Sequence, residues 1–310
     1  MERVTLGSTE IAVCKNGFGA LPIQRISQED AVYLARKASK GGMDFFDTAR
    51  AYTDSELKLG EALESVRDQV IIATKTMAKT AEQFWSDLTE SLKNLRTDHI
   101  DIYQFHNPKF CPLPGDGTGL YDAMVEAKKQ VKILHIGITN HRLDVAKTAI
   151  ESGLYETLQF PFSYISGDQE LELVKMCKEK NMGFIAMKGL SGGLLTDSRA
   201  CYAFEAQFDN VVPIWGVQRE KELDEWLSYI DHPVSMTEEI AALIEADRKD
   251  LAGEFCRGCG YCMPCPAGIE INTCARMIQM IRRSPNSKCL DEESQKMMMN
   301  IENCLHCGRC

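Results

Sequence analysis

Polar residues follow the apolar runs of the first half of the chain, at the points where those runs end. Four of them can move or stabilise protons: Asp47, Tyr52, Lys75 and His106. Three more carry a hydroxyl or an amide: Thr139, Asn140 and Gln159. If the apolar runs are parallel strands of one barrel, their carboxyl ends converge on one rim and these side chains meet there. A carboxylate, a phenol, an ammonium and an imidazole on one rim predict proton-transfer chemistry.

The chemistry follows from how these groups affect one another. A tyrosine phenol titrates near pH ~10, so Tyr52 alone would be a reluctant acid at neutral pH. An ammonium at Lys75 would stabilise the phenolate and lower this pKa, and Asp47 would hold the ammonium in place. The phenol would then protonate an alkoxide as hydride arrives at a carbonyl, while His106 orients the carbonyl oxygen. Each residue alone also fits a structural role, but their joint placement favours catalysis.

Cysteines form the second chemical group, because nine of the 13 fall between Cys256 and Cys310. A C-x2-C-x2-C-x2-C-P motif comprises Cys256, Cys259, Cys262, Cys265 and Pro266. A C-x2-C-x2-C motif comprises Cys304, Cys307 and Cys310. In a reducing compartment such spacing indicates metal ligation rather than disulfides. Structural zinc usually takes paired C-x2-C ligands, whereas this pattern resembles the bacterial two-cluster ferredoxins. We therefore expect 4Fe-4S clusters, with zinc as the alternative.

The ferredoxin resemblance also implies a ligand scheme, since there the fourth cysteine of each motif ligates the other cluster. One complete cluster would be held by Cys265, Cys304, Cys307 and Cys310. A second would be held by Cys256, Cys259 and Cys262, and its expected fourth ligand would lie beyond Cys310. We expect that the chain is truncated. The alternatives are that Cys274, Cys289 or an outside ligand substitutes, or that this cluster is incomplete.

The elements that must position the rim residues alternate along the first 235 residues. After a hairpin (Val4–Leu6 with Ile11–Val13), strands are expected at Gly17–Ala20, Met43–Phe46, Val70–Thr74, Ile100–Phe105, Ile133–Ile138, Thr157–Phe160, Gly183–Met187 and Val211–Trp215. Helical patterns separate most of them, at Gln28–Lys40, Glu56–Val66, Ala81–Leu95, Tyr121–Val131, Leu143–Glu151 and Glu170–Lys180, and another follows the last strand at Glu220–Tyr229. Eight such units predict a (β/α)8 TIM barrel, with an open doubly-wound sheet as the alternative.

Composition sets the domain organisation and the class of partner. The chain has 310 residues, which suits a barrel at 1–235, a helical linker at 236–252 and a small ferredoxin-like iron–sulfur domain at 253–310. A formal net charge of −10 argues against a nucleic-acid binder. No apolar run is long enough for a membrane span, and MERVTLGSTE does not read as a signal peptide, so we expect a cytoplasmic protein.

The rim residues lie in segments that resemble the aldo/keto reductases, which are NAD(P)-dependent TIM-barrel enzymes. These segments are FFDTARAY, IIATKT, YQFHNP, HIGITN and LQF, and the resemblance runs from the N-terminal hairpin to about residue 235. It implies a catalytic tetrad of Asp47, Tyr52, Lys75 and His106, with Tyr52 as general acid. It also implies that Thr139, Asn140 and Gln159 hold the nicotinamide carboxamide. With its cysteine-rich end, the chain resembles the subgroup with a ferredoxin-like C-terminal extension, which suggests an anaerobic or low-oxygen cell.

Two positions depart from the family's usual nucleotide site. Met187 stands where an aromatic would stack on the nicotinamide, and Glu222 stands where many relatives carry an arginine for the adenosine 2′-phosphate. Arg219 and Lys221 could attract that phosphate, so NADP and NAD both remain open. Backbone N–H groups of the turn Gly189–Gly193, which follows the seventh strand, are expected to bind phosphate, although a simple tight turn is the alternative. Further nucleotide contacts are expected from Gly19, Ala20, Leu190, Gly192, Gly216 and Gln218.

Three functional hypotheses follow. The first is an oxidoreductase that moves hydride between a nicotinamide and a small carbonyl/alcohol pair. The second is an electron-transfer protein in which the barrel docks a nucleotide, or a ferredoxin or flavodoxin partner, while the clusters relay electrons. In the third, which is compatible with the first, the clusters have no redox role and only stabilise a small domain. Substrate specificity is expected from the loops Lys109–Gly119 and Thr196–Asn210.

Overall fold

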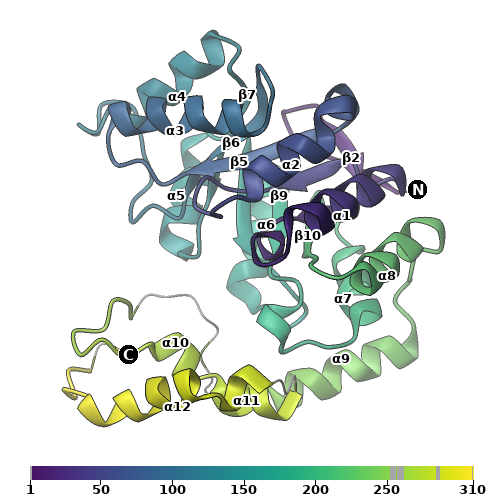
Figure 1. Ribbon diagram of the computed structural model, residues 1–310, viewed down its shortest axis with the longest axis vertical. Helices are drawn as coiled ribbons and strands as arrows, with labels where there is room; N and C mark the ends of the chain where they lie inside the picture. The colour runs from purple at the N-terminus through teal and green to yellow at the C-terminus, as the bar shows by residue number, and fades with distance from the viewer. Residues whose placement is uncertain (1, 252–255, 257–261, 284–286, 309) are drawn as a thin grey trace.

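Strands and helices alternate in the computed structural model of the protein, which describes residues 2–251, 256, 262–283, 287–308 and 310 (Figure 1). The strands are β1 (Arg3–Thr5), β2 (Ala12–Cys14), β3 (Gly17–Gly19), β4 (Phe45–Asp47), β5 (Ile71–Thr76), β6 (Ile100–His106), β7 (Ile133–Thr139), β8 (Thr157–Pro161), β9 (Gly183–Met187) and β10 (Val211–Gly216). The helices up to the end of the barrel are α1 (Gln28–Lys40), α2 (Ser55–Leu63), α3 (Ala81–Asn94), α4 (Leu120–Lys129), α5 (Leu143–Ser152), α6 (Asp168–Glu179), α7 (Ser198–Glu205) and α8 (Glu220–Asp231). The later helices are α9 (Glu238–Asp250), α10 (Ile271–Cys274), α11 (Met277–Arg283) and α12 (Glu292–Met299).

The barrel closes through the pairing of its first and last strands. Strands β3 to β10 form one closed, parallel sheet in which β10 pairs with β3, so that Gly216 lies opposite Gly19. The TIM barrel predicted from the alternation is therefore confirmed, and the open sheet is excluded. Short 3-10 turns interrupt the connections at Pro22–Arg25, Glu64–Gln69 and Ser191–Gly193.

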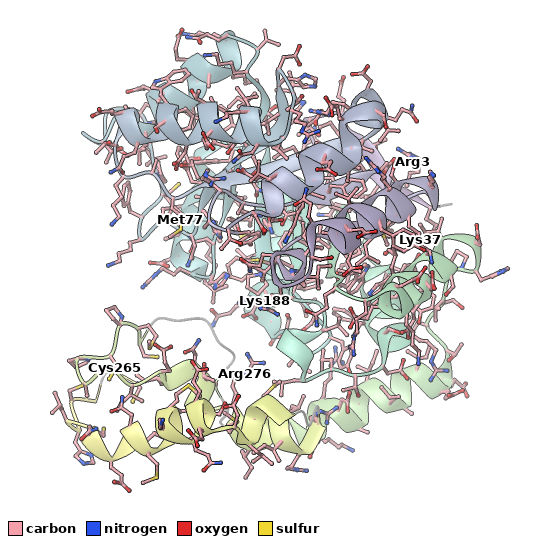
Figure 2. All side chains as sticks on the ribbon, viewed as in Figure 1. Arg3, Lys37, Met77, Lys188, Cys265 and Arg276 are labelled. Carbon is pink, nitrogen blue, oxygen red and sulfur yellow. The ribbon has the colours of Figure 1, made fainter. Side chains whose placement is uncertain are left out.

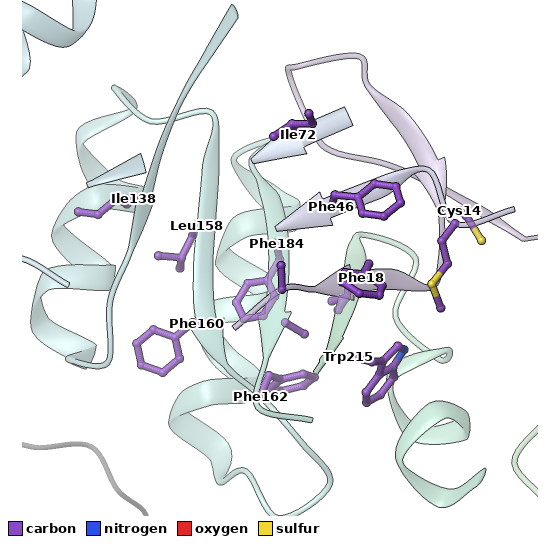
Figure 3. Close-up of a cluster of buried hydrophobic side chains, with 14 of the residues drawn as sticks. Cys14, Phe18, Phe46, Ile72, Ile138, Leu158, Phe160, Phe162, Phe184 and Trp215 are labelled. Carbon is purple, nitrogen blue, oxygen red and sulfur yellow. The ribbon is translucent and has the colours of Figure 1, made fainter. Parts of the chain in front are cut away.

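The N-terminal hairpin closes one end of the barrel. Strands β1 and β2 pair antiparallel, and Val4, Leu6 and Val13 are buried in one cluster with inward side chains such as Phe45 and Ile102. The second, larger core lies between the strands and the surrounding helices, where Figure 3 shows side chains including Phe46, Ile138 and Phe184. Because the hairpin occupies one end, the chemistry is left to the opposite end, at the carboxyl ends of the strands.

Helix α7 was not predicted, since Thr196–Asn210 was expected to be a variable loop. The helix has only eight residues, too few for a helical period to be recognised in the sequence. The available signal was Asp197, whose side chain accepts the backbone N–H of Ala200 at 3.1 Å and caps the helix.

The C-terminal helices lie along one side of the barrel (Figure 1). Helix α9 packs on α7, and Arg248 donates from Nε to the carbonyl oxygen of Tyr164 at 2.7 Å. Arg283 of α11 donates to the carbonyl oxygen of Leu194 at 2.7 Å and pairs with Asp250 at 2.8 Å. None of the described helices is both long and apolar enough to cross a membrane.

Candidate active site

Strand register places the predicted rim residues at neighbouring levels of the barrel. Gly19 lies opposite Asp47, and Asp47 lies opposite Ala73, two residues before Lys75 on β5. On the other side of the barrel, His106 lies opposite Thr139, and Thr139 lies opposite Gln159. The parallel pairing thus brings side chains from five strands to one end of the barrel, as the sequence predicted.

A buried ion pair occupies the centre of this rim. Lys75 Nζ lies 2.7 Å from each carboxylate oxygen of Asp47 and also donates to the Thr48 carbonyl oxygen at 2.6 Å. Both side chains are almost completely buried. Burial raises the pKa of Asp47, while the adjacent Lys75 ammonium opposes that rise. The three bonds fix the ammonium in one position.

Tyr52 and His106 lie beside this pair and contact each other. The Lys75 Nζ atom lies 5.3 Å from the centre of the Tyr52 ring, and the Tyr52 and His106 rings meet edge to face with centres 5.7 Å apart. Burial raises the pKa of Tyr52 despite the opposing effect of Lys75. The ammonium thus acts in the predicted direction, but the net shift is upward because desolvation of the phenolate outweighs it.

His106 is neutral at physiological pH in this environment. Burial, reinforced by the charges of Lys75 and His141, lowers the pKa of His106 to about 3. Its Nδ1 atom is buried and has no hydrogen-bond partner among the described residues. A protonated phenol and a neutral imidazole can therefore both hydrogen-bond to an oxygen atom placed between them.

The residues expected to hold the nicotinamide lie on the same rim and already have partners. Thr139 Oγ1 lies 4.0 Å from the sulfur of Met187. The Asn140 side chain donates to the Pro108 carbonyl and accepts from the backbone N–H of Arg142, which ties two rim loops together. Gln159 accepts from Gln104 at 2.8 Å and lies 3.3 Å from Asp47. The side-chain amides of Asn140 and Gln159 each keep one N–H without a partner among the described residues, which a carboxamide oxygen could accept.

The turn after β9 approaches its neighbours too closely for a side chain at Gly189. A Cβ atom there would lie 2.5 Å from both a Glu205 carboxylate oxygen and the Trp215 ring. The following turn contains Gly192 with a φ of +67°, and the Gly193 N–H donates to the Leu190 carbonyl at 3.0 Å. This Gly189–Gly193 turn, predicted to bind phosphate, is thus held against the barrel wall.

At the last strand, Glu222 organises the start of α8. Its Oε2 atom accepts the backbone N–H groups of Gln218 and Arg219, and its Oε1 atom accepts from the Arg219 guanidinium at 2.7 Å. Glu222 therefore neutralises the charge of Arg219. Gly216, another expected nucleotide contact, lies at the end of β10 opposite Gly19.

Comparison with known proteins identifies the group to which this rim belongs. Residues 15–200 match the sequence profile of the aldo/keto reductase family. The chain belongs to the aldo/keto reductase family. It is 31% identical over 216 residues to L-galactose dehydrogenase of Arabidopsis thaliana, covering 64% of this chain and 68% of that protein. It is 30% identical over 216 residues to the aldo-keto reductase YhdN of Bacillus subtilis, covering 63% of this chain and 64% of that protein.

Solved structures of aldo/keto reductases share the barrel. The holo form of the reductase AKR11C1 from Bacillus halodurans superposes with a TM-score of 0.70 at 18% identity, covering 80% of this chain and 96% of that one. An aldo/keto reductase of Klebsiella pneumoniae in complex with NADP and acetate gives a TM-score of 0.69 at 19% identity, covering 79% and 95%. The chain is thus an enzyme of an oxidoreductase family, as predicted.

In this aldo/keto reductase the predicted cluster ligands lie on the C-terminal segment. One cavity of about 480 Å³ is lined by Cys262, Cys265, Cys274, Cys304, Cys307 and Cys310. Cys256 is partly buried, and Cys259 lies outside the described residues. Within the described part of the chain, no three histidine, cysteine or acidic side chains are grouped closely enough to hold a metal ion. The cysteines thus face one space without closing on each other.

Two features of the site were missed by the sequence analysis. Arg276 reaches from the C-terminal segment to the turn after β9, where it donates to the Ser191 carbonyl. Glu205 is fully buried below the same turn, and neither of its carboxylate oxygens has a partner among the described residues. Cys111, in the loop after β6, is buried, and this burial raises the pKa of its thiol to about 11, which disfavours the reactive thiolate at neutral pH.

Glu205 gives a testable pH dependence of stability. Burial raises the pKa of Glu205 well above its usual value, so the unfolded chain releases this proton at a lower pH than the folded protein. Wild-type stability should fall as pH rises through this interval, whereas Glu205→Gln lacks that slope. The difference in free energy of unfolding between the two should grow by about 1.4 kcal/mol per pH unit above ~5. Chemical denaturation at several pH values measures it, and parallel curves would contradict the assignment.

Proposed function

We propose that this aldo/keto reductase interconverts a small aldehyde or ketone and its alcohol by hydride transfer, with NADP(H) or NAD(H) as the co-substrate. The observation that carries the proposal is the buried Asp47–Lys75 pair beside Tyr52 and His106. The bound nicotinamide supplies or accepts the hydride. The four side chains supply what hydride transfer to a carbonyl lacks, namely a proton and a fixed position for the oxygen.

The tetrad residues act as follows in the direction of reduction. The neutral imidazole of His106 donates a hydrogen bond that orients the carbonyl oxygen. The Tyr52 phenol gives its proton to this oxygen as negative charge develops, so the alcohol gains one hydride and one proton. Lys75 stabilises the phenolate that remains, Asp47 keeps Lys75 in position, and solvent returns the proton to Tyr52. Because burial favours the protonated phenol, the acid form needed for reduction is the resting form.

The nucleotide would be held by residues around this rim. Its carboxamide would meet Thr139, Asn140 and Gln159, with Met187 against the ring. The rest of the nucleotide would contact Gly19, Ala20, Leu190, Gly192, Gly216, Gln218 and Arg219. The strongest support is the location of these residues at the carboxyl ends of β3, β7, β8, β9 and β10. The Klebsiella pneumoniae relative binds NADP on the same fold.

Replacing Glu222 with glutamine should raise the preference for NADPH over NADH by about tenfold, the effect of ~1.4 kcal/mol. Glutamine keeps an acceptor oxygen for the start of α8, but it releases the charge of Arg219 to meet a 2′-phosphate. The ratio of kcat/KM for the two nucleotides measures this. Glu220→Gln on the same helix is the control, since Glu220 pairs with Lys37 instead. A ratio unchanged in Glu222→Gln would place the adenosine elsewhere.

The cysteine cavity is the candidate site for an iron–sulfur cluster. Its lining includes Cys265, Cys304, Cys307 and Cys310, the four thiols of the predicted complete cluster, and apolar side chains such as Ile269 and Leu305. Among the described residues these thiols are not grouped at ligand distance, so a bound cluster would have to draw them together. We infer that these four thiolates hold a 4Fe-4S cluster. Cys256, Cys259 and Cys262 would hold a second, for which Cys274 on the same cavity is a candidate ligand. Residues 253–310 would then be a ferredoxin-like domain joined to the barrel by residues 236–252.

The competing function is electron transfer to a ferredoxin or flavodoxin partner through the clusters. A nicotinamide delivers two electrons as hydride, whereas a cluster accepts one, and the chain contains no flavin motif that would divide the pair. The reductase function is tested by steady-state oxidation of NADPH and NADH with a panel of aldehydes and ketones. Nucleotide oxidation that depends on the carbonyl is the expected result. Nucleotide oxidation that does not depend on the carbonyl but requires an added ferredoxin would contradict the reductase function.

A further inference from the structure

Two arginines of the C-terminal segment, Arg276 and Arg283, donate hydrogen bonds to carbonyl oxygens of the turn that follows β9. Arg283 donates to the Leu194 carbonyl at 2.7 Å, and Arg276 donates to the Ser191 carbonyl at 2.5 Å. Arg283 is neutralised by Asp250 and Asp247 of α9. Its role is therefore that of an anchor between the segment and the barrel.

Arg276 differs from Arg283 in the partners of its guanidinium. No carboxylate of the described residues forms an ion pair with Arg276, and its Nε atom is buried without a hydrogen-bond partner in the described part of the chain. A Cβ atom added to Gly192 would lie only 3.0 Å from the Nη2 atom of Arg276, so the guanidinium packs directly against the glycine turn. A half-buried guanidinium whose buried Nε atom lacks a partner among the described residues indicates a place for an anion.

The surroundings of Arg276 form a small pocket at the barrel mouth. The pocket, of about 80 Å³, is lined by Lys188 and Ser191 from the turn after β9, by Ser163 and Ser166 after β8, and by Arg276. Figure 2 shows Lys188 and Arg276 on facing sides of the space between the barrel and the C-terminal segment. One acidic side chain, Glu170, also lines it, but its carboxylate accepts the Gly167 N–H at 2.9 Å and caps α6.

We propose that Arg276 completes a binding site for the diphosphate of the nicotinamide nucleotide, shared between the barrel and the C-terminal segment. β9 is the seventh strand of the barrel, after which barrels commonly bind phosphate. A guanidinium fork matches two phosphate oxygens, and Lys188 adds a second positive charge from the opposite wall. The inference rests on the proposed nicotinamide-dependent function and extends it by assigning a ligand outside the barrel.

The same residues connect the anion pocket to the cysteine cavity. Cys274 and Ala275 line the cavity, and Arg276 follows them directly at the junction of α10 and α11. Whatever orders the cysteine cavity therefore also positions the guanidinium. The state of the cysteine-rich segment should change the affinity for nucleotide without altering the catalytic residues.

Titration calorimetry with NADPH tests the assignment. Arg276→Gln should raise the Kd of NADPH about 10- to 100-fold, as expected for a lost charged hydrogen bond, while kcat at saturating nucleotide changes little. Arg276→Lys keeps the charge without the fork and should recover part of the affinity. Arg282→Gln is the matched control, because Arg282 is exposed and bonds only Asp250 among the residues that the structure describes. Lys188→Gln weakens the site from the barrel side, independently of how the C-terminal segment folds.

The outcomes separate this inference from the proposed function. A wild-type Kd for NADPH in both Arg276→Gln and Lys188→Gln would overturn the diphosphate site, even if carbonyl reduction is confirmed. The same holds if Arg276→Gln raises only the KM of a carbonyl substrate that carries a carboxylate, or alters only the absorbance of the metal centre. Wild-type protein that binds neither NADPH nor NADH would overturn the proposed function, and this site with it.

Discussion

Replacing Tyr52 with phenylalanine is expected to lower kcat for carbonyl reduction by about 10²- to 10⁴-fold, the usual contribution of a general acid. The variant keeps the ring that meets His106 edge to face at 5.7 Å, so the shape of the space beside Lys75 is preserved. Only the proton donor is removed. Steady-state rates with NADPH and the best aldehyde of the panel measure the loss.

The Kd of NADPH should stay within about threefold of wild type in Tyr52→Phe, since the hydroxyl gives its proton to the substrate and not to the nucleotide. Tyr33→Phe is the matched control, because Tyr33 lies exposed on α1 and bonds Glu220 away from the rim. Retained turnover in Tyr52→Phe, with nucleotide binding intact, would remove Tyr52 from the role of acid.

Replacing Cys304 with serine should remove one 4Fe-4S cluster, and with it roughly four irons per chain and the corresponding visible absorbance. Cys304 lines the cysteine cavity with Cys265, Cys307 and Cys310, and three thiolates do not complete the ligand set. Iron analysis and absorbance of anaerobically prepared protein measure the loss. The proposed coupling of the cavity to Arg276 predicts that the Kd of NADPH rises in Cys304→Ser, while kcat at saturating nucleotide is preserved.

Cys111→Ser is the control for this loss, since Cys111 is buried in the loop after β6, beside the Pro112 carbonyl and Tyr155 and away from the cysteine cavity. Its iron content should match wild type. Wild-type protein with one zinc ion and no iron, or Cys304→Ser with full iron, would contradict the predicted ligand set. Zinc would satisfy the same four thiolates in a tetrahedral site.

The sequence predicted the barrel and the rim because both depend on local patterns. Each strand is a short apolar run, and the residue that ends it, such as Asp47 or His106, is fixed at the rim by parallel pairing. Helix α7 was missed because its eight residues are too few for a helical period to be recognised.

Long-range contacts and desolvation could not be predicted from local patterns. Nothing near Arg276 in the sequence indicates that it contacts Ser191, 85 residues earlier. Lys75 lowers the pKa of Tyr52 as predicted, but the net shift is upward because burial outweighs this effect, and local patterns do not reveal burial. Likewise, spacing alone placed Glu222 beside Arg219, but only the structure shows that the two are paired.

The most direct test of the central claim is a mixing experiment on protein purified anaerobically, so that any proposed cluster is retained. NADPH and then NADH are added with and without an aldehyde, while nicotinamide oxidation and the visible absorbance expected of the proposed clusters are followed together. The tetrad geometry predicts one nucleotide oxidised per carbonyl reduced, no oxidation without carbonyl, and an unchanged metal absorbance. Bleaching of the metal centre by nucleotide in the absence of carbonyl would contradict this account and place the cysteine-rich segment in the path of the electrons.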